Sequence, residues 1–294
     1  MKKKTLAIVL AILAVVMCFT LAACNGGETK DNSLADETTL AADESTAAGE
    51  EDTTAAEIVE MTESDIDYIT KKGKLVVGMT KYEPMNYLDE NNEWTGFDTE
   101  FAQAVAKELG VEVEFIEIDW DNKFFELSAR QIDCVWNGMT ITDEAKLNSN
   151  VSDAYVKNAQ VVVMKSDKLA DYKDADSIKE LAFAVESGSA GQKELDALGI
   201  TGYTAVSTQA DALLEVSSGA ADACVIDITM ANAMTGEGTS YANLGYELEL
   251  STEEYGIAFR KGSDMTAKVN GIIADMKADG TLKALADKYE LTLA

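Results

Sequence analysis

The chain has 294 residues, with 53 acidic and 24 basic side chains, a formal net charge of -29 and no histidine. The excess of negative charge repels phosphate backbones, so nucleic acid is excluded as a partner. The absence of histidine excludes His-dependent catalytic triads, His general bases and His metal sites. Because the cysteines also lack zinc spacing, we expect neither a metal nor a cofactor.

The N-terminus predicts a lipoprotein export signal over residues 1–23. Three lysines precede an apolar run that ends in Leu21-Ala22-Ala23-Cys24, and the run is short for a spanning helix. Cys24 is then the lipid-bearing first residue of the mature protein. The alternative is an ordinary transmembrane anchor with a chance cysteine. The prediction places the protein on the outer face of the cell membrane, held there by lipid.

Residues 24–62 are predicted to form the lipidated cysteine and a disordered acidic tether. From 25 to 62 the chain has eleven acidic residues against one basic residue, Lys30. Such a segment buries too little apolar area to offset the entropy of ordering it. We therefore expect the tether to provide reach and no chemistry.

The remaining 232 residues, 63–294, suffice for one large domain or for two lobes. No second long apolar run follows, so no further membrane span is expected. Hydrophobic periodicity predicts an α/β fold with a mainly parallel sheet. The expected strands cover 74–78, 111–115, 134–139, 161–164, 181–185, 223–227 and 255–259. The expected helices cover 97–109, 124–129, 192–198, 211–217, 269–276 and 282–289.

The segment 220–227 repeats the pattern of 130–137, which favours two lobes of similar topology. Ligands of open α/β sheets bind beyond the carboxyl ends of the strands, so the residues that follow strands are the candidates for a site. Cys134 and Cys224 both lie in apolar runs, where a buried and inert thiol is the commonest state. A disulfide between them is the alternative.

Four stretches carry a resemblance to a known family. They are 82–85 (YEPM), 96–102 (GFDTEFA), 138–144 (GMTITDE), and 255–259 (YGIAF) with 261–263 (KGS). The chain resembles the extracellular solute-binding proteins of ABC importers, in the polar-amino-acid family that includes glutamine-, histidine- and arginine-binding proteins. The resemblance implies a two-lobed periplasmic-binding-protein-like (type II) fold. Lobe 1 is then 63–159 plus 256–294, lobe 2 is 163–251, and a hinge closes both over a ligand.

The resemblance also implies a ligand site. Tyr82 and Trp120 match positions where aromatic rings cover the ligand side chain; the alternative is that they are core aromatics. Gly138, Met139 and Thr140 match the stretch whose backbone and hydroxyl hold the ligand's carboxylate and ammonium groups, and ordinary turn chemistry is the alternative there.

Two further elements complete the expected site. Asp227, at the end of its strand, matches the family's acid for the α-ammonium group, with a helix-capping or solvated aspartate as the alternative. Ser187 and Ser189 lie in a turn that opens a helix, so its free N–H groups could receive a carboxylate. Simple helix capping also accounts for that turn.

The sequence departs from the family pattern at the expected arginine, where it has Ala145. Its two arginines, Arg130 and Arg260, lie in segments expected to face away from the cleft, and Lys146 is one residue from the expected position. Glu186 replaces a residue that is often basic, and with Glu83 and Asp227 it makes the predicted site acidic. A cationic or neutral polar amino acid is therefore favoured over an acidic one.

The predicted function is that of a monomeric, lipid-anchored receptor that delivers a small amino acid, or a related polar zwitterion or cation, to an ABC permease. It is not expected to be an enzyme. The alternatives are a secreted dehydratase that uses Glu186 and Asp227 as acid and base, since the same fold hosts such enzymes, and a ligand sensor without a transport role.

Overall fold

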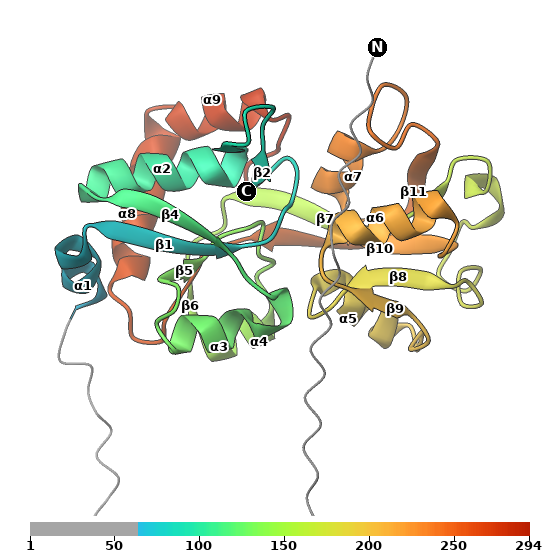
Figure 1. Cartoon of the computed structure of the whole chain (residues 1–294), viewed down its shortest axis with the longest axis horizontal. Coiled ribbons are helices and arrows are strands. Elements are labelled where there is room, and N and C mark those ends of the chain that lie inside the picture. Colours follow the sequence, from blue (N-terminus) through green and yellow to red (C-terminus); the bar gives the residue numbers. More distant parts are fainter. Residues whose placement is uncertain (1–63) are drawn as a thin grey trace, which may run out of the picture. The chain divides into compact units, whose positions relative to one another are not determined.

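The computed structural model describes residues 64–294. The predicted export signal, Cys24 and the tether of 25–62 lie outside the described residues. Two five-stranded sheets and a two-stranded hairpin organise this part of the chain, and Figure 1 shows helices on both faces of each large sheet. Within these residues, no helix combines the length and the apolar character that a membrane crossing requires.

The first sheet has the strand order β4-β1-β5-β12-β6. Its strands are β1 (Lys74–Met79), β4 (Glu112–Glu117), β5 (Cys134–Val135), β6 (Asn150–Val151) and β12 (Ala258–Phe259). The two-stranded hairpin is β2 (Tyr87–Leu88) and β3 (Trp94–Thr95). The helices of this half are α1 (Asp65–Lys72), α2 (Phe97–Leu109), the short 3-10 helix η1 (Trp120–Asn122), α3 (Lys123–Ser128), α4 (Asp143–Asn148), α8 (Met265–Ala278) and α9 (Thr281–Lys288).

The second sheet has the strand order β11-β7-β10-β8-β9. Its strands are β7 (Val156–Lys165), β8 (Phe183–Glu186), β9 (Thr204–Val206), β10 (Ala223–Asp227) and β11 (Leu244–Tyr255). The helices of this half are the 3-10 helix η2 (Leu169–Asp171), α5 (Ala190–Ala197), α6 (Gln209–Ser218) and α7 (Ile228–Met234). The chain enters the second sheet through β7 and leaves it through β11, so these two paired strands are the crossovers between the sheets.

The two sheets share one topology. In the first, β1 pairs in parallel with β4 and β5, while β12 pairs antiparallel with β5. In the second, β8 pairs in parallel with β9 and β10, while β7 pairs antiparallel with β10. The repeated sequence patterns therefore form the middle strand of each sheet, β5 and β10, as the echo between them predicts.

Most predicted elements are present, with four main differences. No strand was predicted over most of β11. The strand expected at 134–139 ends at Val135, because the chain bends at Asn137 and at Gly138, whose φ is left-handed. The strand expected at 255–259 is interrupted at Gly256, where one strand of the second sheet ends and one of the first begins. The prediction of a mainly parallel sheet is only partly right, since β6, β7, β11 and β12 all pair antiparallel.

The apolar sequence patterns form the interior. Phe97, Phe101 and Val105 of α2 are fully buried, and α2 ends at Leu109, where the Gly110 N–H bonds to two helix carbonyl groups. The described thiols, Cys134 and Cys224, are both free and buried. Both cysteines are buried, as predicted, and no disulfide joins them in this structure. Burial raises the pKa of both thiols, so both stay protonated and unreactive.

Candidate functional site

A small cavity lies where the strands of both sheets end. The first sheet and its loops contribute one group of lining residues: Tyr82, Trp120, Asn137, Gly138 and Thr140. The second sheet and its loops contribute the other: Glu186, Ser189, Ala190, Gln209 and Asp227. Six of the eight predicted site residues therefore meet around one space. Its volume of about 20 Å³ holds about one water molecule, whereas a benzene-sized guest needs roughly 150 Å³. An amino acid therefore enters only if the two halves move apart.

Asp227 is the acidic end of this cavity. It is the last residue of β10, and its side chain is buried. Its Oδ1 accepts a hydrogen bond of 2.8 Å from Gln160 Nε2 and another from Asn158, and Gln209 donates to its Oδ2. These amides orient the carboxyl group but carry no positive charge. Burial therefore raises the pKa of Asp227.

Glu253, on the crossover strand β11, is a second acid that the sequence analysis missed. Its Oε1 accepts hydrogen bonds from Thr140 Oγ1 at 2.9 Å and from Gln160 Nε2 at 2.8 Å. Burial, followed by the charge of Asp227, raises the pKa of Glu253 to about 8. The two carboxyl groups share the amide donors Gln160 and Asn158, and the negative charge of one favours a proton on the other.

Glu186 is the third carboxyl group near the cavity. It ends β8, and its Oε1 accepts a hydrogen bond of 3.4 Å from Thr80 Oγ1 across the two sheets. Burial and then Asp227 raise its pKa to about 8. Glu186 and Asp227, two of the three acids expected near the cleft, both line the cavity. In the described residues, no three Asp, Glu or Cys side chains form a group that could hold a metal ion.

Gly138 brings the chain close to the aromatic rings. Its φ of 56° is left-handed, and an added Cβ would lie 2.6 Å from Tyr82 Cε1 and 3.1 Å from Tyr255 Cε2. Its N–H donates a 2.6 Å hydrogen bond to Asp98 Oδ2, which also accepts one of 2.9 Å from Tyr155. That N–H is therefore already occupied by Asp98. Asp98, at the start of α2, thus positions Gly138. The sequence alone assigned no role to Asp98.

The two predicted aromatic residues border the cavity. Tyr82 is 2 % exposed, and its hydroxyl lies 2.5 Å from that of Tyr255 and also bonds to Thr229. These bonds join the first sheet to α7 and to β11. Trp120, 7 % exposed, opens η1. Both rings are also part of the core, so the functional and the structural interpretations of these residues coexist.

The other predicted residues differ in position. Ser189 borders the cavity, and its hydroxyl accepts a hydrogen bond of 3.1 Å from Gln192 N as the N-cap of α5. Met139 lines a second cavity of about 30 Å³ that shares Trp120 and Thr140 with the first. Ser187 borders neither cavity. Its N–H bonds to the carbonyl of Val206 on the neighbouring strand β9.

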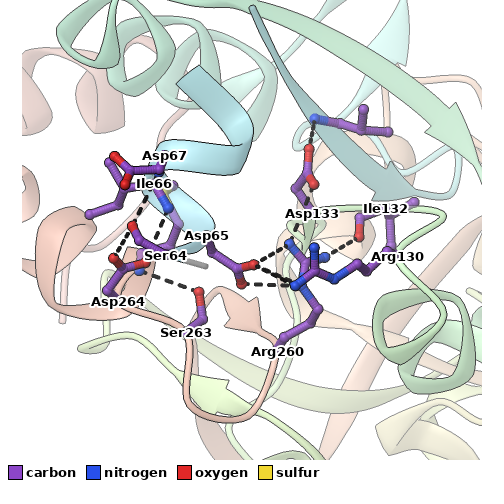
Figure 2. A network of polar contacts seen from close by, with 12 residues as sticks. Ser64, Asp65, Ile66, Asp67, Arg130, Ile132, Asp133, Arg260, Ser263 and Asp264 are labelled. Carbon is purple, nitrogen blue, oxygen red and sulfur yellow. Dashed lines mark hydrogen bonds and ion pairs between the residues drawn. The ribbon is translucent and has the colours of Figure 1, made fainter. Parts of the chain in front are cut away.

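Both arginines lie away from these cavities, as expected. Figure 2 shows Arg260 in a buried network at the start of α1, where it contacts the carboxylates of Asp65 and Asp133. Arg130 lies at 3.7 Å from Asp65 in the same network. No arginine of the chain therefore reaches the cavity.

Two charged residues expected near the cleft lie elsewhere. Lys146 borders a surface hollow of about 570 Å³ and Glu83 another of about 770 Å³. Neither residue lines the cavity of Asp227. The hollows are larger than that cavity, but none of the eight predicted site residues lines them.

Comparison with known proteins assigns the family. Residues 75–292 match the model of the bacterial extracellular solute-binding proteins, family 3. The chain belongs to this family. It is 30% identical over 233 residues to the L-cystine-binding protein of Escherichia coli strain K12, with 77% of this chain and 86% of that protein covered. It is also 30% identical over 287 residues to the L-cystine-binding protein of Bacillus subtilis strain 168, with 95% and 96% covered.

Solved structures agree with the sequence relatives. An arginine-binding protein variant from T. maritima is 31% identical, with a TM-score of 0.72 over 76% of this chain and 98% of that one. An ancestral amino acid-binding protein, described as a precursor of cyclohexadienyl dehydratase, is 33% identical, with a TM-score of 0.70 over 77% and 99%. The fold is therefore that of the two-lobed type II periplasmic amino-acid-binding proteins, as the resemblance implied.

Proposed function

We propose that the protein captures a free amino acid between its two sheets and delivers it to an ABC permease. The observation that supports this most is the cavity in which Asp227, Gly138 and Thr140 converge beside Tyr82 and Trp120. A carboxylate and polar oxygens suit an ammonium group, and the rings suit the rest of the ligand. The arrangement needs groups from both sheets, so ligand binding and closure are coupled.

The expected site residues are proposed as ligand contacts on the same grounds. Asp227 receives the α-ammonium group, while Tyr82 and Trp120 cover the side chain. Gly138, Met139 and Thr140 form the floor of the site, and the turn of Ser187 and Ser189 covers it from the second sheet. The proposed lobes are 63–159 with 256–294, and 163–251.

The proposed ligand is a polar amino acid with a zwitterionic or cationic character. Relatives described as L-cystine-binding and arginine-binding proteins support this range. Both ligands carry an α-ammonium group and at least one further polar or charged group. The three carboxyl groups near the cavity, Glu186, Asp227 and Glu253, disfavour an acidic side chain.

The anchor and the place of action complete the proposal. Cys24 carries lipid and holds the protein on the outer face of the membrane, with the acidic segment of 25–62 as the tether. The protein acts as a monomer that docks on a permease. Mass spectrometry of the protein isolated from membranes should show a diacylglycerol-modified Cys24; a protein that retains residues 1–23 contradicts this part of the proposal.

A thermal-shift screen tests the binding function. The protein from Glu63 onward is heated with each common amino acid and with L-cystine, at millimolar concentration. A ligand that binds only the folded state raises the melting temperature by mass action. At least one polar amino acid should stabilise the protein, and no shift with any of them would contradict the proposal.

A dehydratase is the second candidate, because one structural neighbour is described as the precursor of such an enzyme. Glu186 could hold the required acidic proton, since its pKa is raised to about 8. Recovery of the stabilising amino acid unchanged after long incubation argues for the binding function. Formation of a dehydrated product argues for the enzyme.

A further inference from the structure

Lys123 places a buried positive charge beside the proposed site. It is the first residue of α3 and only 6 % exposed. Its Nζ donates 3.0 Å hydrogen bonds to the carbonyl oxygens of Trp120 and Gly188, and it lies 4.9 Å from the centre of the Trp120 ring. Trp120 belongs to the first sheet's half and Gly188 to the second, so the ammonium group lies between the halves.

This ammonium group has no carboxylate partner among residues 64–294. The nearby Glu144 forms its ion pair with Lys193 instead. Burial lowers the pKa of Lys123 to about 8, which still leaves most of the side chain charged at neutral pH. An ammonium group has three N–H donors, and the two carbonyl groups use two of them. A buried charge without a counter-ion is costly, so its position calls for a negative partner.

The cavity at Lys123 continues the proposed amino-acid site. The second cavity, of about 30 Å³, is lined by Lys123 and by Ala145, the position at which the sequence lacks the expected arginine. It shares Trp120, Thr140 and Ala190 with the cavity of Asp227. A ligand that spans the shared residues would therefore face carboxyl groups of the protein at one end and the ammonium group of Lys123 at the other.

The loop at Gly188 fits tightly against the segment that holds Lys123. The φ of Gly188 is 70°, and an added Cβ would lie 2.7 Å from Asp121 Cα. The second half can therefore approach Lys123 closely only because residue 188 is glycine. Closure thus surrounds the ammonium group and removes it from water, which strengthens its attraction to an anion.

We propose that Lys123 binds the α-carboxylate of the amino acid and takes the place of the guanidinium group that is absent at Ala145. The ligand then lies with its amine at Asp227 and its carboxylate at Lys123. The site selects amino acids with a free carboxylate over their amides. This inference rests on the proposed function and identifies the anion-binding residue of that same site.

Lys123 could instead act only as a latch, because its bond to Gly188 joins the two halves. The two roles predict different effects of Lys123→Met, which keeps the apolar stem and removes the charge. Loss of a latch weakens the binding of every ligand equally. Loss of a carboxylate partner weakens only ligands that have the carboxylate.

The experiment is a calorimetric titration with three matched pairs: L-arginine and L-argininamide, L-histidine and L-histidinamide, and L-cystine and its diamide. Slightly acidic buffer keeps the amines of the amides protonated. For whichever pair binds, the wild type should prefer the acid by about 10- to 100-fold, the size expected of a charge-assisted bond. In Lys123→Met this preference should disappear. The control Lys173→Met removes an exposed lysine that is paired with Glu247 and lines neither cavity, and it should keep the preference.

The outcomes separate the two proposals. A wild type that binds the acid and the amide equally, or a Lys123→Met variant that loses equal affinity for both, overturns the role of Lys123 and leaves the proposed function intact. A wild type that binds none of the six compounds overturns the inference, and the wider thermal-shift screen then decides on the function.

Discussion

Replacing Glu253 by glutamine tests whether the carboxyl pair makes the protein less stable as the pH rises. The pKa of Glu253 is raised to about 8 in the folded protein, mainly by burial and then by Asp227. In an unfolded chain a glutamate titrates near about 4.3. Between these values the folded state holds a proton that the unfolded state has lost. The contribution of this proton to stability is complete below the pKa that Glu253 has in the unfolded chain. It is lost as the pH rises through the pKa that Glu253 has in the folded protein.

The magnitude follows from the linkage. One such group lowers the free energy of unfolding by about 1.4 kcal/mol per pH unit inside the interval, or up to about 2.7 kcal/mol from pH 5 to pH 7. Glu186 and Asp98, with pKa values raised to about 8 and about 7, act in the same direction. In the wild type, the slope of the unfolding free energy against pH therefore combines the contributions of several groups. Glu253→Gln should remove the contribution of Glu253.

Urea unfolding followed by circular dichroism, at several values from about pH 5 to about pH 8, measures these slopes. Glutamine keeps the size of glutamate, and its side-chain oxygen can still accept from Thr140 and Gln160, so the variant should fold. The control Glu254→Gln removes the same charge from the exposed neighbour on β11 and should keep the wild-type slope. Equal slopes in the wild type and Glu253→Gln, or a wild type that gains stability as the pH rises, would refute the reasoning.

Three further changes test other parts of the structure. Gly138→Ala should lower the free energy of unfolding by about 1–3 kcal/mol in urea, because residue 138 has a left-handed φ and lies close to the Tyr82 ring. A loss below about 0.5 kcal/mol would contradict the close approach of residue 138 to Tyr82. Asp65→Asn should lower the free energy of unfolding by about 3 kcal/mol, because it leaves the buried Arg260 with less negative charge beside it. The affinity for the amino acid, measured by calorimetry, should stay unchanged. A stability equal to that of the wild type would argue against the network of Figure 2. Glu144→Gln breaks the exposed pair with Lys193 and should change affinity in the same titration by less than about fivefold; a larger loss would show that the pair holds the halves together.

Strand and helix positions were predictable where the apolar pattern is regular. The helix of Phe97–Leu109 and the strand of Ala223–Asp227 follow directly from periodicity and from their end signals. The crossover strand Leu244–Tyr255 was missed, because its alternating apolar residues are separated by charges and its exposed face resembles a loop. Its pairing with β7 depends on tertiary contacts that local sequence does not encode.

The site was predictable only in outline. Asp227 and Gly138 follow strands, so their position at the sheet edges could be inferred. Glu253 and Lys123 could not, because each lies in a stretch with several other charged residues, and only the fold shows which of these point inward. A charged residue buried beside the site is recognised by its surroundings, which the sequence does not give.

The central claim is that an amino acid binds with its amine at Asp227. Isothermal titration of Asp227→Asn, with the amino acid that most stabilises the wild type, tests it most directly. The account predicts affinity about 10- to 100-fold weaker, since asparagine keeps the shape but loses the charge. The surface variant Asp275→Asn on α8 should bind like the wild type. Wild-type affinity in Asp227→Asn would contradict the account.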